Sequence, residues 1–102
     1  MRMNREMMNP RQSLIKIVSV RGIAQALEMI GRTWARLDRK ADAEGAYAEA
    51  MRYYGSIQME QGERDVRRCR FLIRQAEDPL LVPTDEEREA LAAALLVFYN
   101  GF

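Results

Sequence analysis

Residues 23–37, IAQALEMIGRTWARL, decide the fold of this chain. Their large apolar residues recur at steps of four, three, four and three residues: Ile23, Leu27, Ile30, Trp34 and Leu37. Because an α-helix has 3.6 residues per turn, this spacing predicts a helix with one apolar face. Such a face must pack against another element of the chain or against a second copy.

The start of this helix is predicted at Asn9-Pro10, because Asn caps helices and Pro suits the first helical position. Leu14, Ile17 and Val20 extend the apolar face toward that start. Residues 14–20, LIKIVSV, also fit a β-strand through their β-branched residues. Since no other segment reads as a strand, that alternative requires a strand from a second subunit.

Two further helices are predicted from the same spacing. The first follows residues 38–40 and is expected to end near Gln61-Gly62, where Gly favours a left-handed cap. The next is expected to end at Asp78-Pro79, because the residue before Pro disfavours helix. Their apolar positions are Ala43, Tyr47, Ala50, Tyr54 and Ile57 in the first, and Val66, Cys69, Ile73 and Ala76 in the second.

A capping box predicts the start of a fourth helix, in which Thr84 is the cap and Glu87 follows three residues later. Its apolar positions are Leu91, Leu95 and Phe98. Short connections make successive helices antiparallel, so the sequence predicts an all-α fold, a four-helix hairpin array or small bundle. With 102 residues, we expect a flexible N-terminus over residues 1–9 and a single helical domain over residues 10–102.

The first two predicted helices resemble a tetratricopeptide repeat. The residues at matching positions are Leu27, Ile30, Gly31, Trp34, Ala43, Tyr47 and Ala50, with Gly31 at the helix crossing. A second, weaker match involves Tyr54, Gly55, Gln61-Gly62, Phe71 and Pro79. The two registers are offset by 24 residues rather than the 34 of the family. The resemblance implies a hairpin stack that binds a peptide or a partner protein on a concave face.

The sequence offers little for catalysis. It has no His and a single Cys, which removes the common nucleophile pairs and structural zinc sites. Residues 85–89 carry four acids, which a helix start favours electrostatically. Cys69 has arginines on both sides, a setting that activates a thiol, yet it occupies an apolar-stripe position. We therefore expect no enzyme activity, no catalytic residues, no metal site and no cofactor.

Two groups of residues are candidates for partner binding. A basic face on the third predicted helix is made of Arg64, Arg67, Arg68, Arg70 and Arg74, and would suit phosphates or acidic side chains unless nearby acids neutralise it. An aromatic group would form docking contacts with a partner or a second subunit. Its members are Tyr53, Phe98, Tyr99 and Phe102.

These observations predict a small non-catalytic protein-interaction module, an adaptor or regulatory protein, that binds a protein partner and self-associates. A nucleic-acid-associated factor using the basic face is an alternative, which a net charge of only +1 disfavours. A small phage-type inhibitor of a larger assembly is another. The chain has no apolar run long enough for a membrane span and no signal-like segment, so a cytoplasmic location is expected.

Overall fold

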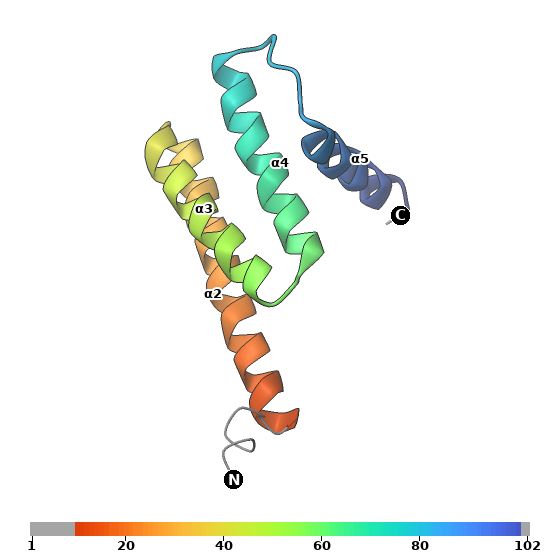
Figure 1. The fold of residues 1–102 in the computed structure, drawn as a ribbon. Coiled ribbons are helices and arrows are strands. Elements are labelled where there is room, and N and C mark those ends of the chain that lie inside the picture. The colour runs from red at the N-terminus through yellow and green to blue at the C-terminus, as the bar shows by residue number, and fades with distance from the viewer. Residues whose placement is uncertain (1–9, 101–102) are drawn as a thin grey trace.

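A computed structural model describes residues 10–100 of the chain, with side chains up to residue 95. Four helices make up most of it: α2 (Pro10–Arg36), α3 (Lys40–Ser56), α4 (Glu60–Glu77) and α5 (Asp85–Asn100) (Figure 1). Helices α2 and α3 form an antiparallel hairpin, α4 packs beside α3 and contacts α2, and α5 packs on α4. The prediction of an all-α, four-helix array is confirmed. The N-terminal segment predicted to be flexible, residues 1–9, lies outside the described residues.

Residues 14–20 are helical and lie inside α2, so the strand alternative is wrong. The β-branched residues of this segment lower helix propensity only slightly, and no described strand lies beside them to complete a sheet. Their continuation as helix makes α2 the longest element, at 27 residues. Its N-terminal part extends past the end of α3 in Figure 1.

The two turns between α2, α3 and α4 share one geometry. Each contains a non-glycine residue with a left-handed backbone, Asp38 at φ 59° and Gln58 at φ 54°. In each, the next backbone N–H closes the preceding helix: Arg39 N donates to the Trp34 carbonyl at 2.8 Å, and Met59 N donates to the Tyr54 carbonyl at 3.0 Å.

The end of α3 was predicted near Gln61-Gly62, and this is wrong, because α3 ends at Ser56 and Gly62 lies in the first turn of α4. By contrast, the predicted stop of α4 before Pro79 is confirmed at Glu77. The capping box is confirmed as well: Thr84 N donates to Glu87 Oε1 at 2.9 Å, and Glu87 N donates to Thr84 Oγ1 at 3.2 Å. Leu95, predicted at an apolar position of α5, is instead 59% exposed.

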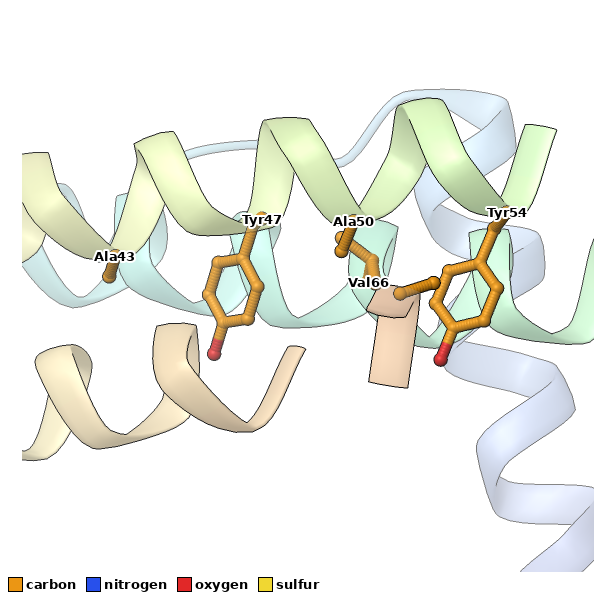
Figure 2. Packing of buried hydrophobic residues seen from close by; sticks show 6 residues of the cluster. Ala43, Tyr47, Ala50, Tyr54 and Val66 are labelled. Carbon is orange, nitrogen blue, oxygen red and sulfur yellow. The ribbon is translucent and has the colours of Figure 1, made fainter. Parts of the chain in front are cut away.

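The core lies between α2, α3 and α4, and α3 contributes most of it. As Figure 2 shows, the rings of Tyr47 and Tyr54 project from α3 toward α2. The buried cluster consists of Ala24, Ala43, Tyr47, Ala50, Tyr54 and Val66. Four of these residues belong to the apolar face that the sequence predicts for α3, which is therefore confirmed.

The apolar face predicted for α2 is only partly covered. Leu27 and Trp34 are half-buried against the core, whereas Ile23, Ile30 and Leu37 are 45, 46 and 62% exposed. The residues of α2 that are buried are Ala24, Glu28 and Gly31. Small residues face α3 because the two tyrosine rings already fill the space there, so Ile23, Ile30 and Leu37 are left exposed.

Two glycines set the distance between neighbouring helices. A Cβ atom added at Gly31 would lie 2.6 Å from the Tyr47 ring, and one added at Gly62 would overlap the ring of Tyr54. Each ring is almost completely buried, so neither can swing into solvent without emptying part of the core. Gly31 therefore fixes the approach of α2 to α3, and Gly62 fixes the approach of α4 to α3.

We expect Gly31→Ala and Gly62→Ala to lower the free energy of unfolding by about 1–3 kcal/mol each, because the added methyl overpacks a closed contact. Gly45→Ala is the matched control, since nothing lies within 4 Å of a Cβ added there. It should raise helix stability by up to about 1 kcal/mol. Urea denaturation followed by circular dichroism measures all three; equal effects at the three sites would contradict the close tyrosine contacts.

Candidate interaction cleft and the basic helix

A carboxylate is buried at the centre of the fold. Glu28, 8% exposed, accepts a hydrogen bond from the Tyr54 hydroxyl at 2.8 Å and forms an ion pair with Arg32 at 2.5 Å. A buried carboxylate is costly unless it is paired and hydrogen-bonded, and here both oxygens have a partner. Burial, and then the hydrogen bond to Glu28, raise the pKa of Tyr54. The network therefore joins α2 to α3 through groups that tolerate few substitutions.

Next to this network, α2 and α4 border an open cleft with a volume of about 520 Å³. Tyr47 of α3 contributes to its lining, and Leu72, Ile73 and Ala76 come from α4. The full lining is Arg32, Ala35, Arg36, Asp38, Lys40, Tyr47, Cys69, Leu72, Ile73 and Ala76. An apolar interior with a basic edge suits a ligand that combines apolar groups with negative charge.

The three cations of the cleft differ in their partners. Arg32 is held by Glu28, and Lys40 lies 3.3 Å from Glu77. Burial is the largest single influence and disfavours the charged form of Arg32, but Glu28, Cys69 and Tyr47 together outweigh it, so the pKa of Arg32 is raised. Arg36 is exposed and forms no ion pair with any described residue. It is the cation of this cleft that remains available to an acidic ligand.

Cys69 lies in the same cleft and is half-buried. Its side chain packs against the core cluster, as its position in the apolar stripe predicts. Burial, followed by the neighbouring Cys69, raises the pKa of the Tyr47 phenol. The thiol thus borders both the core and the open space between α2 and α4.

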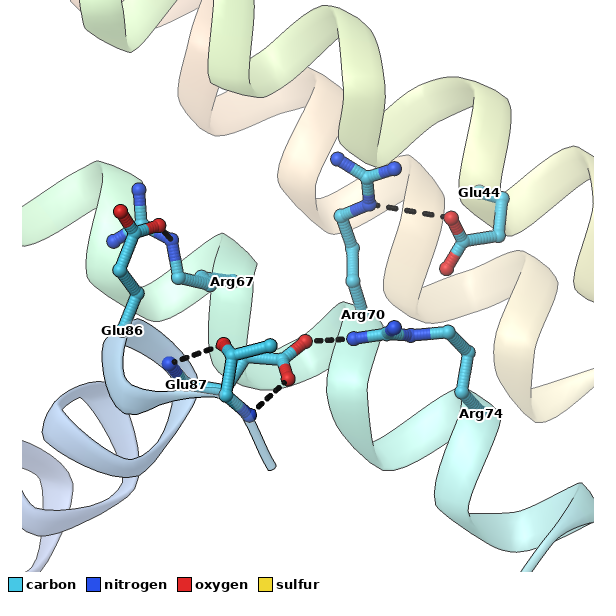
Figure 3. Close-up of polar contacts among 7 residues, drawn as sticks. Glu44, Arg67, Arg70, Arg74, Glu86 and Glu87 are labelled. Atoms are coloured by element: carbon cyan, nitrogen blue, oxygen red, sulfur yellow. Dashed lines mark hydrogen bonds and ion pairs between the residues drawn. The ribbon is translucent and has the colours of Figure 1, made fainter. Parts of the chain in front are cut away.

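The predicted basic face lies mainly between helices rather than on a free surface. Arg67 lies 3.6 Å from Glu86 of α5, Arg70 lies 3.2 Å from Glu44 of α3, and Arg74 pairs with Glu87 of α5 (Figure 3). Arg68 is 4.0 Å from Asp65 within α4. Arg64 has no ion pair among the described residues and borders a smaller cavity with Ala93 and Ala94 of α5. These ion pairs favour a structural role, in which the arginines connect α4 to its neighbours.

Of the predicted aromatic group, Tyr53 is the member whose side chain belongs to the described residues. Tyr53 is half-buried against the core, and Arg52 lies over its ring at 5.3 Å. Phe98 and Tyr99 belong to the backbone of α5, but their side chains lie outside the described part of the chain, as does Phe102 altogether.

Neither the role of Glu28 nor the cleft was predicted from the sequence. A signal for Glu28 was present, because it is the only acid of α2 and lies four residues after Ala24 and three before Gly31, on the same helix face. The cleft had no such signal. It depends on how α2 and α4 are placed on either side of Tyr47, which periodicity within one helix does not specify.

Compared with known protein families, curated proteins and solved structures, the chain has no significant match. None of the described helices is long and apolar enough to span a membrane.

Tyr54→Phe should lower the free energy of unfolding at neutral pH by about 1–3 kcal/mol, because buried Glu28 loses a donor. The raised pKa values of Tyr47 and Tyr54 also have a consequence in alkali. Above about pH 10, the usual pKa of tyrosine, the unfolded chain loses these protons before the folded chain does, so stability falls as pH rises.

Removing one of the two phenols should make this alkaline decline less steep in Tyr54→Phe than in the unmodified chain. Tyr53→Phe is the control, because its hydroxyl makes no hydrogen bond among the described residues. Urea denaturation at pH 7, 9 and 10.5 gives both quantities. If Tyr53→Phe and Tyr54→Phe behave alike at every pH, the Glu28 network contributes nothing to stability.

Proposed function

We propose that this chain is a small non-catalytic protein-interaction module, an adaptor or regulator acting in the cytoplasm, and that it binds a segment of a partner protein in the cleft between α2 and α4. The observation that carries the proposal is the lining of this cleft, which combines apolar residues with Arg36, a cation that has no ion pair among the described residues. A partner segment with one or two large apolar side chains and a nearby carboxylate fits both features.

The size and openness of the cleft agree with a peptide ligand. A volume of about 520 Å³ lies within the range of small-ligand sites, and its lining comes from three helices and the first turn of the fold. Leu72 in this lining is 47% exposed, so an apolar side chain of a partner would cover surface that the fold leaves in contact with water. An acidic group would then face Arg36 at the border.

The resemblance to a tetratricopeptide repeat supports the same proposal. Gly31 lies against Tyr47 at the crossing of α2 and α3, and Ala43 and Ala50 are buried on the facing helix, which are the packing roles that the resemblance implies. In that family, hairpin stacks bind partners on a concave face. Here, α2 and α4 are the first helices of successive hairpins, and the cleft lies between them.

The nucleic-acid alternative is less favoured. Four of the five arginines of the predicted basic face have carboxylate partners within the chain, and each of these pairs would have to open or reorganise before binding phosphate. Negative charge from α3 and α5 also lies directly beside them, at Glu44, Glu86 and Glu87.

Selection of peptides from a random displayed library on the immobilised chain tests the proposal. We expect the selected sequences to combine large apolar residues with Asp or Glu, and their affinity to fall at least tenfold in Arg36→Glu and in Leu72→Glu. Arg52→Glu is the charge-matched control, because Arg52 lies on α3 outside the cleft and is exposed. Isothermal titration of one selected peptide against the variants gives the affinities.

Two outcomes would contradict this proposal. One is selection of peptides without acidic residues whose binding is unchanged by Arg36→Glu. The other is salt-sensitive binding of a short DNA duplex that is lost in Arg64→Ala, since counterion release makes phosphate binding fall steeply with salt. The second outcome would favour the nucleic-acid-associated function.

A further inference from the structure

The outer side of α2 carries no charge over most of its length. Between Lys16 and Arg36 the charged residues are Arg21, Glu28 and Arg32, which follow one another at steps of seven and four and therefore share one flank. The side facing away from α3 is uncharged and exposed. Its members are Ile15, Ser19, Gly22, Ile23, Ala26, Met29, Ile30, Thr33 and Leu37, which we call the outer face.

The large residues of the outer face are extensively exposed to water. Ile15 is 58% exposed, Met29 is 66% exposed and Leu37 is 62% exposed. Together with Thr33 and Trp34, the outer-face residues Met29, Ile30 and Leu37 line a shallow cavity of about 280 Å³. An ordinary solvent-facing side of a helix is polar or charged, so this uncharged side is typical of a covered surface.

The distribution of charge argues for a second copy as the partner on this face. On the flank of α2 that carries Arg21 and Arg32, an approaching copy would meet like charges, because the one acid of α2, Glu28, is buried and already paired. The outer face has no charge between Lys16 and Arg36, so two copies that meet there leave these charges at the ends of the contact. It also offers no charged group that would select an acidic or a basic partner of another kind.

We propose that two copies of this chain pair through their outer faces, with the two α2 helices antiparallel about a twofold axis near Ala26. This register covers the whole outer face, because residues whose numbers are equally distant from 26 come to the same level along the pair. Large apolar residues then share two levels, two hydroxyl-bearing residues share a third, and Ile30 lies opposite a glycine at the fourth. The levels are Ile15 with Leu37, Ser19 with Thr33, Gly22 with Ile30, and Ile23 with Met29.

Gly22 adds to this inference. A Cβ added to Gly22 would meet nothing within 4 Å, so the chain's own packing gives no reason for glycine in the middle of α2. Glycine weakens a helix interior. In the antiparallel pair Gly22 lies at the level of Ile30, where a small residue allows the helices to approach closely.

Sedimentation equilibrium of the full chain between about 1 and 100 µM tests the pairing, since an interface of one helix per copy is at the small end of stable interfaces. We expect a concentration-dependent dimer that Ile30→Glu weakens at least tenfold. Leu72→Glu is the matched control: Leu72 is 47% exposed and Ile30 is 46% exposed, but Leu72 lies in the cleft. A monomer throughout this range, or dissociation by Leu72→Glu alone, would overturn the proposal.

Cysteine cross-linking tests the register independently of any loss of folding. In a Cys69→Ala background, Ala26→Cys should form a disulfide-linked dimer on mild oxidation, because a residue on the twofold axis faces its own copy. Gln25→Cys is one residue away but on a different side of the helix, and it should cross-link at least tenfold more slowly. Equal rates at the two positions would show that α2 does not pair in this way.

The pairing goes beyond the proposed function and does not depend on it. Arg36 and Leu72 line the cleft, whereas the outer face lies on another side of α2, so each surface is altered by its own variants. If the chain does not dimerise, the peptide titration still tests the proposed function. Failure of peptide binding likewise leaves the sedimentation result unaffected.

Discussion

The contact of two tyrosine rings with two glycines is the constraint on which the rest of this structure depends. Helix α3 directs Tyr47 against Gly31 of α2 and Tyr54 against Gly62 of α4. The second ring also carries the hydroxyl that donates to the buried Glu28. A single helix therefore positions both of its neighbours: α4 by the close packing of Tyr54 on Gly62, and α2 by the packing of Tyr47 on Gly31 together with the hydrogen bond to Glu28. Burying large aromatic side chains on the central helix supplies much of the apolar contact in a small core.

This arrangement has a consequence for α2. Where a ring from α3 fills the contact, α2 has to present small residues, so Ala24 and Gly31 lie inward. Apart from Leu27 and Trp34, which pack beside the core, the large apolar residues of the same helix are left on its other sides. Ile23 and Ile30 are about half exposed for this reason, although their spacing is that of a core-facing stripe. The exposed apolar surface of this chain thus follows from the choice of tyrosine on α3.

How much of the fold the sequence could predict depends on whether the signal was local. The start of α2 at Pro10, the stop of α4 before Pro79 and the Thr84–Glu87 capping box depend on neighbouring residues, and all three were predicted correctly. The stripe on α3 was also correct, because it is the face with neighbours on two sides. The prediction of a covered apolar face was wrong for most of α2. Periodicity locates the apolar residues of a helix but does not show which of its sides another helix covers.

The same limit applies to the site. Five arginines in eleven residues indicated a basic face unless nearby acids neutralise it. Three of them pair with Glu44, Glu86 and Glu87 of other helices, and the sequence does not show which charges meet. Gly62 was taken for a helix cap because glycine commonly ends helices, whereas here the absence of a Cβ makes room for Tyr54. In both cases the residue type indicated a special role. The sequence did not show which residue of another helix it contacts.

The separation of charge around α2 links the two surfaces of this chain. Arg32 and Arg36 lie on the side that borders the cleft, and the outer face has no charge between Lys16 and Arg36. A cleft bordered by cations attracts an acidic segment, and an uncharged apolar face associates without regard to charge. If two copies pair through their outer faces, the cleft residues of each copy lie outside that contact. The dimer would then carry two copies of the same binding site, which increases the avidity for a partner that carries the acidic segment more than once.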